Sequence, residues 1–358
     1  MTGTKANLLG LPLKEIEGVV ASLGEPRFRA LQIYRWLYAK RVSKIGAMTD
    51  LSAACRSALS AAHEIRRIAA TDRLVSADGT IKYLFRCDDG SSIESVYIPE
   101  ARRQTICIST QAGCPLKCAF CLTGISGYKR NLKTFEILSQ VAQVMDEARA
   151  RSAKDDRPWN IVVMGMGEPL LNYDNTIEAL RILMDPDGFA ITPKKLTLST
   201  VGILPALEKL KLERLRPNLA ISLHAPTSAL RAKLMPIENK YALKDVIEAA
   251  DSYPSPRGGR VTYEYVLLKD VNDRDEHARA LARLLRGRNG KVNLIPLNPA
   301  DPIPFDSPRA AQVARFEGIL LDAGIPVSVR KPRGRDVLAA CGQLQLNKVA
   351  VLRKPATP

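Results

Sequence analysis

The sequence predicts an α/β protein: a partial (βα)6 barrel preceded by a small helical N-terminal domain and a linking β-hairpin. Three patterns predict this architecture. Apolar residues have helical spacing over residues 1–66, alternate with polar ones over 68–100, and from 103 onward form six strand-like runs, each followed by a helical stretch. Six βα units in a row indicate a parallel sheet with outer helices. Since eight units close a full barrel, six form an open, partial barrel or a doubly wound sheet.

Length and composition are those of an ordinary globular protein. The chain has 358 residues, of which 46% are hydrophobic and 25% charged, so disorder and collagen-like structure are excluded for most of it. The net charge of +16 suits a polyanionic partner, of which nucleic acid is the usual one. No apolar run approaches the roughly 18 residues of a membrane span, and the N-terminus lacks a signal-peptide pattern. We therefore expect a cytoplasmic protein without a membrane partner.

The helical N-terminal domain is expected over residues 1–70 and the hairpin over 71–102. A first helix over 13–23 ends at Gly24, Pro26 opens a second, and Asp50 is the candidate N-cap of a third. This domain is either a packing cap or a platform for nucleic acid. The hairpin turns at Asp88-Asp89-Gly90.

The barrel is expected over residues 103–345, followed by a C-terminal tail over 346–358. The candidate strands are 105–110, 160–164, 195–199, 218–224, 261–267 and 291–297. Helices are expected near 133–150, 174–184, 203–212, 240–251, 274–287 and 308–323. In either sheet arrangement, the loops at the carboxyl ends of the strands should carry the functional site.

A cysteine cluster follows the first barrel strand. Cys114, Cys118 and Cys121 have the spacing C-x3-C-x2-C, and the odd total of seven cysteines in a long chain favours a metal or catalytic role over disulfides. Three thiolates can bind three corners of a cubic iron–sulfur cluster and leave one iron open. The alternative is a zinc site, which needs a fourth ligand such as Cys107 or His224.

This cluster, with Phe120 just before its last cysteine, resembles the radical S-adenosylmethionine (SAM) superfamily. The resemblance implies one 4Fe-4S cluster on Cys114, Cys118 and Cys121, with SAM on the open iron and cleaved by reduction to a 5′-deoxyadenosyl radical. It also implies that the glycine-rich end of the second strand binds SAM through Gly167 and Glu168. Further polar or strand-end residues are expected at the same site: Ser199, Ser222, Leu223, His224 and Asn298.

Three residues outside the cluster indicate a narrower family. Cys107, Glu94 and the segment Ala-Ala-Cys341-Gly-Gln-Leu resemble the RlmN/Cfr family of radical-SAM RNA methyltransferases, over about residues 10–345. Taken alone, the two cysteines would be buried inert thiols and Glu94 a solvated strand residue. The resemblance implies that Cys341 carries the methyl group as S-methylcysteine. It makes Cys107 the resolving thiol, which forms a transient disulfide with Cys341, and Glu94 the proton acceptor.

The chemistry explains why thiols are needed. An amidine carbon of adenine is electron-poor and cannot attack the methyl group of SAM, whereas a thiolate is a good nucleophile. One SAM would methylate Cys341, and a second would supply the radical that activates this methyl group, so two SAM are used per turnover.

The resemblance also implies the substrates: adenosine 2503 of 23S rRNA and adenosine 37 of certain tRNAs, methylated at carbon 2. Two alternatives stay open: a Cfr-like enzyme that methylates carbon 8 of the rRNA base and confers antibiotic resistance, and a non-catalytic iron–sulfur RNA-binding protein. A flavodoxin system is the expected electron donor, and a monomer the expected state. Basic residues near the site could hold phosphates: Lys117, Lys129, Arg130, Lys133, Arg330, Lys331, Arg333 and Arg335.

Overall fold

The fold is that of a computed structural model, which describes residues 5–344. The expected tail over 346–358 lies outside the described residues. In the described part of the chain, no helix is both long and apolar enough to cross a membrane.

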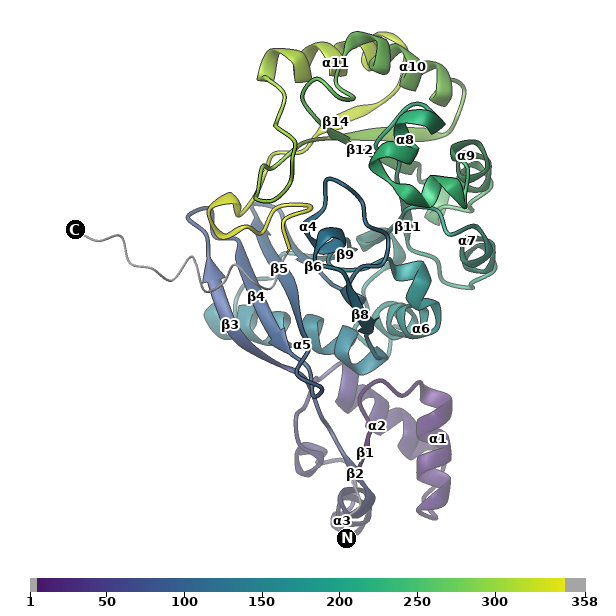
Figure 1. Cartoon of the computed structure of the whole chain (residues 1–358). Coiled ribbons are helices and arrows are strands. Elements are labelled where there is room, and N and C mark those ends of the chain that lie inside the picture. Colours follow the sequence, from purple (N-terminus) through teal and green to yellow (C-terminus); the bar gives the residue numbers. More distant parts are fainter. Residues whose placement is uncertain (1–4, 345–358) are drawn as a thin grey trace, which may run out of the picture.

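One sheet of ten strands forms the body of the described molecule, in the order β14-β13-β12-β11-β10-β9-β6-β5-β4-β3. From β6 to β14 all neighbouring strands are parallel, and the strands curve around α4 with the larger helices outside them (Figure 1). The parallel strands are β6 (Arg103–Cys107), β9 (Trp159–Val163), β10 (Leu196–Thr200), β11 (Asn218–Ser222), β12 (Val261–Leu267), β13 (Gly290–Pro296) and β14 (Val327–Val329). The predicted partial barrel is confirmed.

Each of the six predicted strands and helices of the barrel has a counterpart. The helices are α5 (Thr134–Arg151), α6 (Tyr173–Met184), α7 (Leu204–Lys211), α9 (Leu243–Asp251), α10 (Asp275–Leu285) and α11 (Ala310–Asp322). The sequence analysis missed β14, the short helices α4 (Leu122–Ile125) and α8 (Ser228–Leu234), and the ribbon β7 (Gln111–Gly113) with β8 (Tyr128–Asn131). These elements have three to seven residues, too few to establish a period.

The segment predicted as a linking hairpin is a part of the barrel sheet, which corrects our expectation. The β4 (Ile81–Arg86) and β5 (Ser92–Glu100) hairpin is present, and β3 (Ala69–Val75) adds a third antiparallel strand. β5 pairs antiparallel with β6, with Val96 opposite Cys107. The pairing covers the edge of β6, whose backbone groups would otherwise be open. The domain boundary within this region stays a prediction.

The N-terminal helices are α1 (Leu13–Ser22), α2 (Phe28–Tyr38) and α3 (Ala53–Ala62), with β1 (Ala6–Asn7) paired to β2 (His63–Glu64). The expected N-cap Asp50 is wrong: Ser52 caps α3, because its hydroxyl accepts from Cys55 N at 3.0 Å. Asp50 accepts instead from Trp36 Nε1, at 2.5 Å. This helical unit lies at one end of the barrel (Figure 1).

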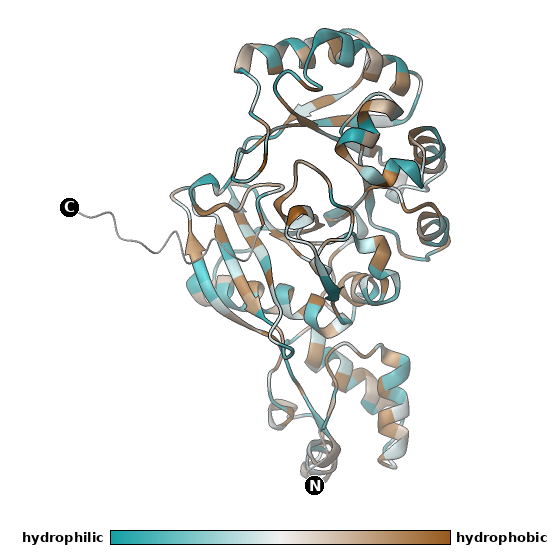
Figure 2. Cartoon of the chain, in the orientation of Figure 1, coloured by the Kyte–Doolittle hydropathy of each residue, from teal (hydrophilic) through white to brown (hydrophobic). Residues whose placement is uncertain are grey.

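Ion pairs join the helical unit to the outer barrel helices. Asp146 on α5 accepts from both Arg41 and Arg67 at 2.8 Å, and Arg35 on α2 contacts Asp187 after α6 at 2.8 Å. The main apolar core lies between the sheet and its helices, and both contain hydrophobic segments (Figure 2). On β12 and β13 apolar residues alternate with polar ones, which are Thr262 and Glu264 on β12 and Lys291 and Asn293 on β13. These polar positions are register partners and share the face of the sheet that lines the inside of the barrel.

Candidate active site

A cavity of about 650 Å³ opens inside the barrel, and three of the predicted cysteines line its wall. Cys107, Cys121 and Cys341 line it, together with Asn298 and Arg330. Its floor is polar, and inward side chains of successive strands form it: Thr105, Asn160, Thr197, Thr262, Glu264, Lys291 and Asn293. The cavity is therefore suited to a polar ligand rather than a lipid.

The cysteine loop is held at both ends by the β7–β8 ribbon. Gly113 has φ +80°, and a Cβ there would lie 1.9 Å from Gly127 O, so only glycine fits. Cys114 N donates to Gly127 O at 3.0 Å, and Cys121 N donates to Cys118 O at 3.2 Å. Ala119 N donates to Leu234 O of α8 at 2.9 Å, which ties the middle of the loop to the barrel. The predicted location of the loop, after the first barrel strand, is thus correct.

The three thiols fit an iron–sulfur cluster. Burial raises the pKa of Cys114 to about 12 and that of Cys118 well above its usual range, and charged neighbours among the same cysteines raise both further. Three thiolates on one short loop, two of them buried, need a cationic group to stabilise them, which the irons of a cluster supply. Among residues 5–344, no three His, Cys, Asp or Glu side chains are grouped as ligands of a single ion, whereas in a four-iron cube each thiolate binds a different iron.

The side chains considered as a fourth zinc ligand are engaged elsewhere. His224 Nδ1 accepts from Val266 N at 3.0 Å, and its ring packs edge-on against Phe120 with 4.7 Å between centroids. Burial lowers the pKa of His224 to about 3, so its imidazole is neutral. Cys107 faces Cys341 across the cavity.

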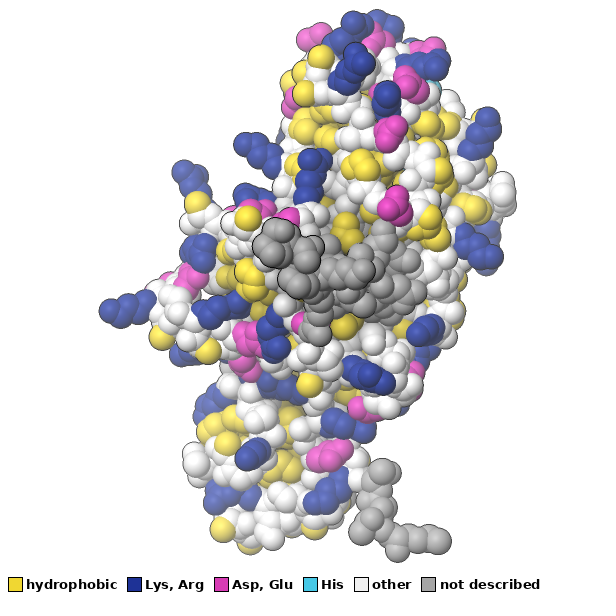
Figure 3. Space-filling model, turned by 60° about the vertical axis from the view of Figure 1, so that its left-hand side comes forward, with side chains coloured by type: hydrophobic (Ala, Val, Ile, Leu, Met, Phe, Trp, Pro, Cys, Tyr) yellow, Lys and Arg dark blue, Asp and Glu magenta, His cyan; other side chains and the backbone are white. Residues whose placement is uncertain are grey.

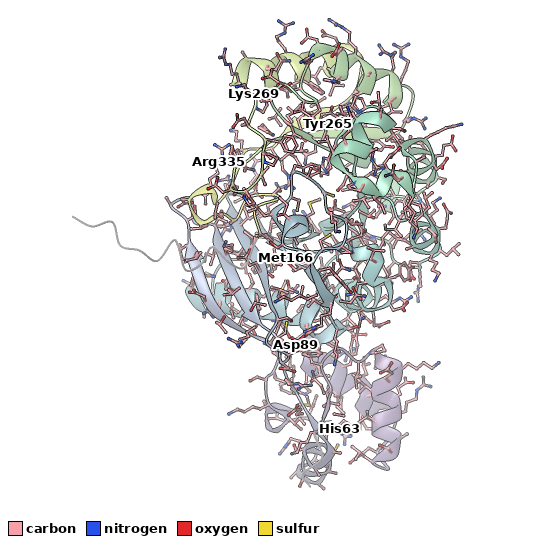
Figure 4. All side chains as sticks on the ribbon, viewed as in Figure 1. His63, Asp89, Met166, Tyr265, Lys269 and Arg335 are labelled. Atoms are coloured by element: carbon pink, nitrogen blue, oxygen red, sulfur yellow. The ribbon has the colours of Figure 1, made fainter. Side chains whose placement is uncertain are left out.

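The glycine-rich loop after β9 is shaped by its own packing. Gly167 has φ +101°, and a Cβ would lie 2.5 Å from Gln111 Cβ. The Glu168 carboxylate accepts from Thr200 Oγ1 at 2.7 Å, Val201 N at 2.9 Å and Leu170 N at 3.0 Å, and burial raises its pKa to about 7. Figure 4 labels the neighbouring Met166 near the centre of the molecule. SAM binding by Gly167 and Glu168 stays a prediction, and neither residue lines the cavity as described.

The other predicted SAM residues divide into two groups. Ser199 Oγ and Ser222 Oγ lie 3.4 Å apart at the ends of β10 and β11, followed by the fully buried Leu223 and by His224. Of the five, Asn298 alone lines the cavity as described, and its Oδ1 accepts from Arg335 Nε at 3.0 Å. Figure 4 labels Arg335 in the segment before Cys341.

Cys341 lies on a loop that rests on the cysteine cluster loop. Gly342 O accepts from Leu122 N at 2.9 Å, directly after Cys121. The loop is also tied to the β3–β4 turn, since Asp336 accepts from Ser76 Oγ at 2.6 Å and from Ala77 N at 3.1 Å. Cys341 is exposed, and Arg330 Nη1 donates to its sulfur at 3.1 Å. The structure thus brings Cys341 to Cys107 and the cluster loop, although Cys341 is more than 200 residues further along the sequence.

Cys107, at the end of β6, is the less accessible of the two thiols. Burial raises its pKa to about 12, a nearby Cys341 thiolate raises it further, and the charge of Arg330 lowers it. A thiolate forms here only with cationic help.

Glu94, the proton acceptor that the resemblance implies, is buried outside the described cavity. It is fully buried on β5, its Oε1 lies 3.2 Å from Lys82 Nζ, and it is not among the cavity-lining residues of the described structure. Lys82 Nζ also donates to Leu338 O at 3.4 Å, so this ion pair lies beneath the Cys341 loop. The alternative of a solvated strand residue is wrong, and the role of Glu94 as proton acceptor stays a prediction.

Breaking this buried pair should destabilise the protein strongly. Glu94→Gln leaves the Lys82 ammonium buried without its carboxylate, which typically costs about 3–5 kcal/mol. The free energy of unfolding, measured by denaturant titration, should recover most of this loss when Lys82→Met is added to the variant. A single variant as stable as the wild type would show that the pair contributes nothing to folding.

The basic residues near the site have different partners. Arg130 makes two contacts of 2.8 Å with Glu136 and one of 2.6 Å with Asp89, so it is a structural residue and not the expected phosphate contact. Lys117, Lys129, Lys133 and Lys331 are exposed. Lysine and arginine side chains are spread over the face shown in Figure 3, from the helical unit to the far end of the barrel. These side chains form a broad surface with many positive charges, which can bind a polyanion.

Two buried polar residues of the cavity were missed from the sequence. Glu264 on β12 is 5% exposed and Asn293 on β13 is 8% exposed, and Asn293 Nδ2 donates to Glu264 Oε2 at 2.7 Å. A signal was available, because each interrupts an apolar strand that should be buried on both faces.

The fold and the site define a radical-SAM enzyme. Residues 108–282 match the family described as the radical SAM superfamily, and residues 6–65 match the family described as the ribosomal RNA large subunit methyltransferase N-terminal domain. Membership of the superfamily implies a 4Fe-4S cluster and SAM as cofactors.

The chain belongs to the RlmN family of RNA methyltransferases. It is 44% identical over 351 residues to the dual-specificity RNA methyltransferase RlmN of Paramagnetospirillum magneticum, covering 96% of this chain and 77% of that protein. To the protein of the same name from Pseudomonas putida strain F1 it is 45% identical over 343 residues, covering 95% and 90%. The crystal structure of a radical SAM methyltransferase from Sphaerobacter thermophilus superposes with a TM-score of 0.89 at 42% identity, covering 95% of this chain and 99% of that one.

Proposed function

We propose that this enzyme methylates carbon 2 of adenine in both 23S rRNA, at adenosine 2503, and tRNA, at adenosine 37. It would do so in the cytoplasm as a monomer, with two SAM per turnover and electrons from a flavodoxin-type donor. The observation that carries the proposal is the shared cavity of Cys341, Cys107 and Cys121. The printed names of the relatives, with their dual specificity for RNA, support two kinds of RNA substrate.

Cys341 is the methyl carrier in this proposal. Its exposed thiolate, beside Arg330, attacks the methyl carbon of SAM. A new carbon–sulfur bond forms, the methyl–sulfonium bond breaks, and S-adenosylhomocysteine leaves. Cys114, Cys118 and Cys121 would hold the cluster, which together with SAM supplies the one-electron chemistry that removes a hydrogen from this methyl group. The resulting carbon radical would add to the adenine ring. Loss of one electron back to the cluster and of the ring proton to a base would then leave a methylene group that links the RNA to Cys341.

Cys107 releases the product. Its thiolate attacks Cys341 Sγ, an S–S bond forms, and the S–C bond breaks with its electron pair going to the carbon, which takes up a proton to become the methyl group. A thiol reductant must reduce the disulfide before the next cycle. Glu94 is the candidate acceptor of the adenine proton; because it is buried beside Lys82 under the Cys341 loop, it acts after this loop has shifted.

The test is product analysis under anaerobic conditions. The enzyme with a reconstituted cluster is given reductant, SAM and either a 23S rRNA fragment or tRNA, and the digested nucleosides are analysed by mass spectrometry. We expect 2-methyladenosine from both RNAs. 8-Methyladenosine would establish the Cfr-like alternative, and RNA binding without any methylated nucleoside would establish the non-catalytic one.

Cys107→Ala should trap the covalent RNA–protein adduct, because no second thiol can then attack Cys341 Sγ. A denaturing gel with labelled tRNA should show a band of retarded, protease-sensitive RNA. The matched control is Cys55→Ala, which removes a buried thiol from α3, outside the cavity. An adduct-free gel with normal product would count against the resolving role.

A further inference from the structure

We propose that Arg330 is the positioning residue of the reactive thiols: it clamps the sulfur of Cys341 within the cavity beside Cys107, and is itself anchored by Glu264. This inference rests on the proposed function, in which both thiols react at sulfur. It assigns to Arg330 a role different from the phosphate contact that its place in a basic run suggests.

The backbone of Arg330 is fixed to the barrel. Arg330 directly follows β14, and its N–H donates to Leu294 O on β13 at 2.8 Å, which continues the hydrogen bonds between the two parallel strands. Cys341, by contrast, follows the short 3-10 helix η6 (Arg335–Val337) in a loop where Leu338 has a left-handed φ of +51°. A side chain from the rigid sheet therefore holds a residue of an irregular loop.

The contact itself is short and charge-assisted. Arg330 Nη1 lies 3.1 Å from Cys341 Sγ, and Nη2 lies 3.8 Å from Met164 Sδ at the end of β9. The guanidinium is half-buried, so its attraction for an anionic sulfur is screened less than at an open surface. The contact with Met164 orients the planar guanidinium, which then holds the Cys341 sulfur through the other nitrogen.

Glu264 lines the same cavity as Arg330, and Asn293, itself bound by Ser328, holds its carboxylate in place. Asn293 is the register partner of both Glu264 and Ser328, so the three side chains lie on the same face of β12, β13 and β14. Asn293 Nδ2 donates to Glu264 Oε2 at 2.7 Å, and Ser328 Oγ donates to Asn293 Oδ1 at 3.0 Å. The charges of the Cys341 thiolate and, second, of Glu264 raise the pKa of Arg330. A buried carboxylate aimed at the cavity has a clear purpose if it fixes this cation.

Arg330 interacts with the two thiols at successive steps of the reaction. While Cys341 is a thiolate, its charge offsets that of Arg330. Once its sulfur carries carbon, the sulfur is neutral, and the charge of Arg330 is left to stabilise a thiolate at Cys107, where it already opposes the effect of burial. The same residue can therefore favour first the methyl acceptor and then the resolving thiol.

The test measures how fast iodoacetamide alkylates Cys341 in the reconstituted enzyme at neutral pH, by mass spectrometry of the peptide. Losing a charge-assisted hydrogen bond to the thiolate should slow alkylation about tenfold in Arg330→Met. Arg330→Lys should recover part of the rate, and Glu264→Gln should lose a smaller part. Lys244→Met, which removes an exposed cation on α9 outside the described cavity, is the matched control and should react like the wild type.

Equal alkylation rates in the wild type, Arg330→Met and Arg330→Lys overturn the proposal. So does a rise in the KM for RNA at constant alkylation rate and kcat, because that pattern defines a phosphate contact. A lower kcat at unchanged KM supports the clamp. If the wild type makes no methylated nucleoside but the alkylation rates differ as expected, the proposed function fails while the clamp stands, so the two failures can be told apart.

Discussion

Replacement of Cys341 by alanine is expected to abolish RNA methylation while SAM is still cleaved. In the proposed mechanism this thiol carries the methyl group, and removing a catalytic nucleophile typically lowers kcat by more than about a thousandfold. The cluster loop should stay intact, because Gly342 holds it through a backbone hydrogen bond to Leu122 that alanine preserves. Since Cys341 is exposed, the substitution should also cost little folding free energy.

Two products must be measured in the same anaerobic reaction. Methylated adenosine should disappear, and 5′-deoxyadenosine should still form in the presence of reductant. Cys87→Ala, at a buried thiol just after β4 and outside the cavity, is the control and should make both products. Normal methylation by Cys341→Ala would mean that another atom carries the methyl group, and the proposed mechanism would be refuted.

The sequence was sufficient for the repeating part of the fold because periodicity is a local property. The parallel strands β11 to β13 are short and rich in apolar residues, and the helices between them are amphipathic, so their positions were predicted within a few residues. β3 alternates between exposed and half-buried positions and has no buried face to mark it. The pairing of β5 with β6 places Val96 opposite Cys107. No local sequence pattern predicts which strand β5 pairs with or in which register.

The site shows the same division. The spacing of Cys114, Cys118 and Cys121 located the cluster loop, because its ligands lie within one short segment. Lys82 could not be recognised as the partner of Glu94, since the two meet across neighbouring strands of a buried sheet. Arg330 was recognised only as one cation in a basic run, because its contact with Cys341 depends on how the loop folds back. Roles that arise from folding require the three-dimensional structure.

Cys118→Ala should remove every activity. Because Cys341→Ala should still cleave SAM, the comparison of the two variants separates radical generation from methyl transfer. With two thiolates left, the loop can no longer hold three corners of the cube, so the brown colour, the bound iron and sulfide, 5′-deoxyadenosine and methylated RNA should all be lost. Cys118 is the most strongly perturbed thiol of the loop, since burial and the charges of Cys121 and Cys114 all raise its pKa. Alanine removes this repulsion, so the cluster-free protein should stay folded, with a cooperative unfolding transition by circular dichroism. Cys55→Ala should keep its full iron content and both products. A Cys118→Ala protein that retained its cluster and cleaved SAM would show that other ligands hold the iron, and the assignment of the cysteine loop would be wrong.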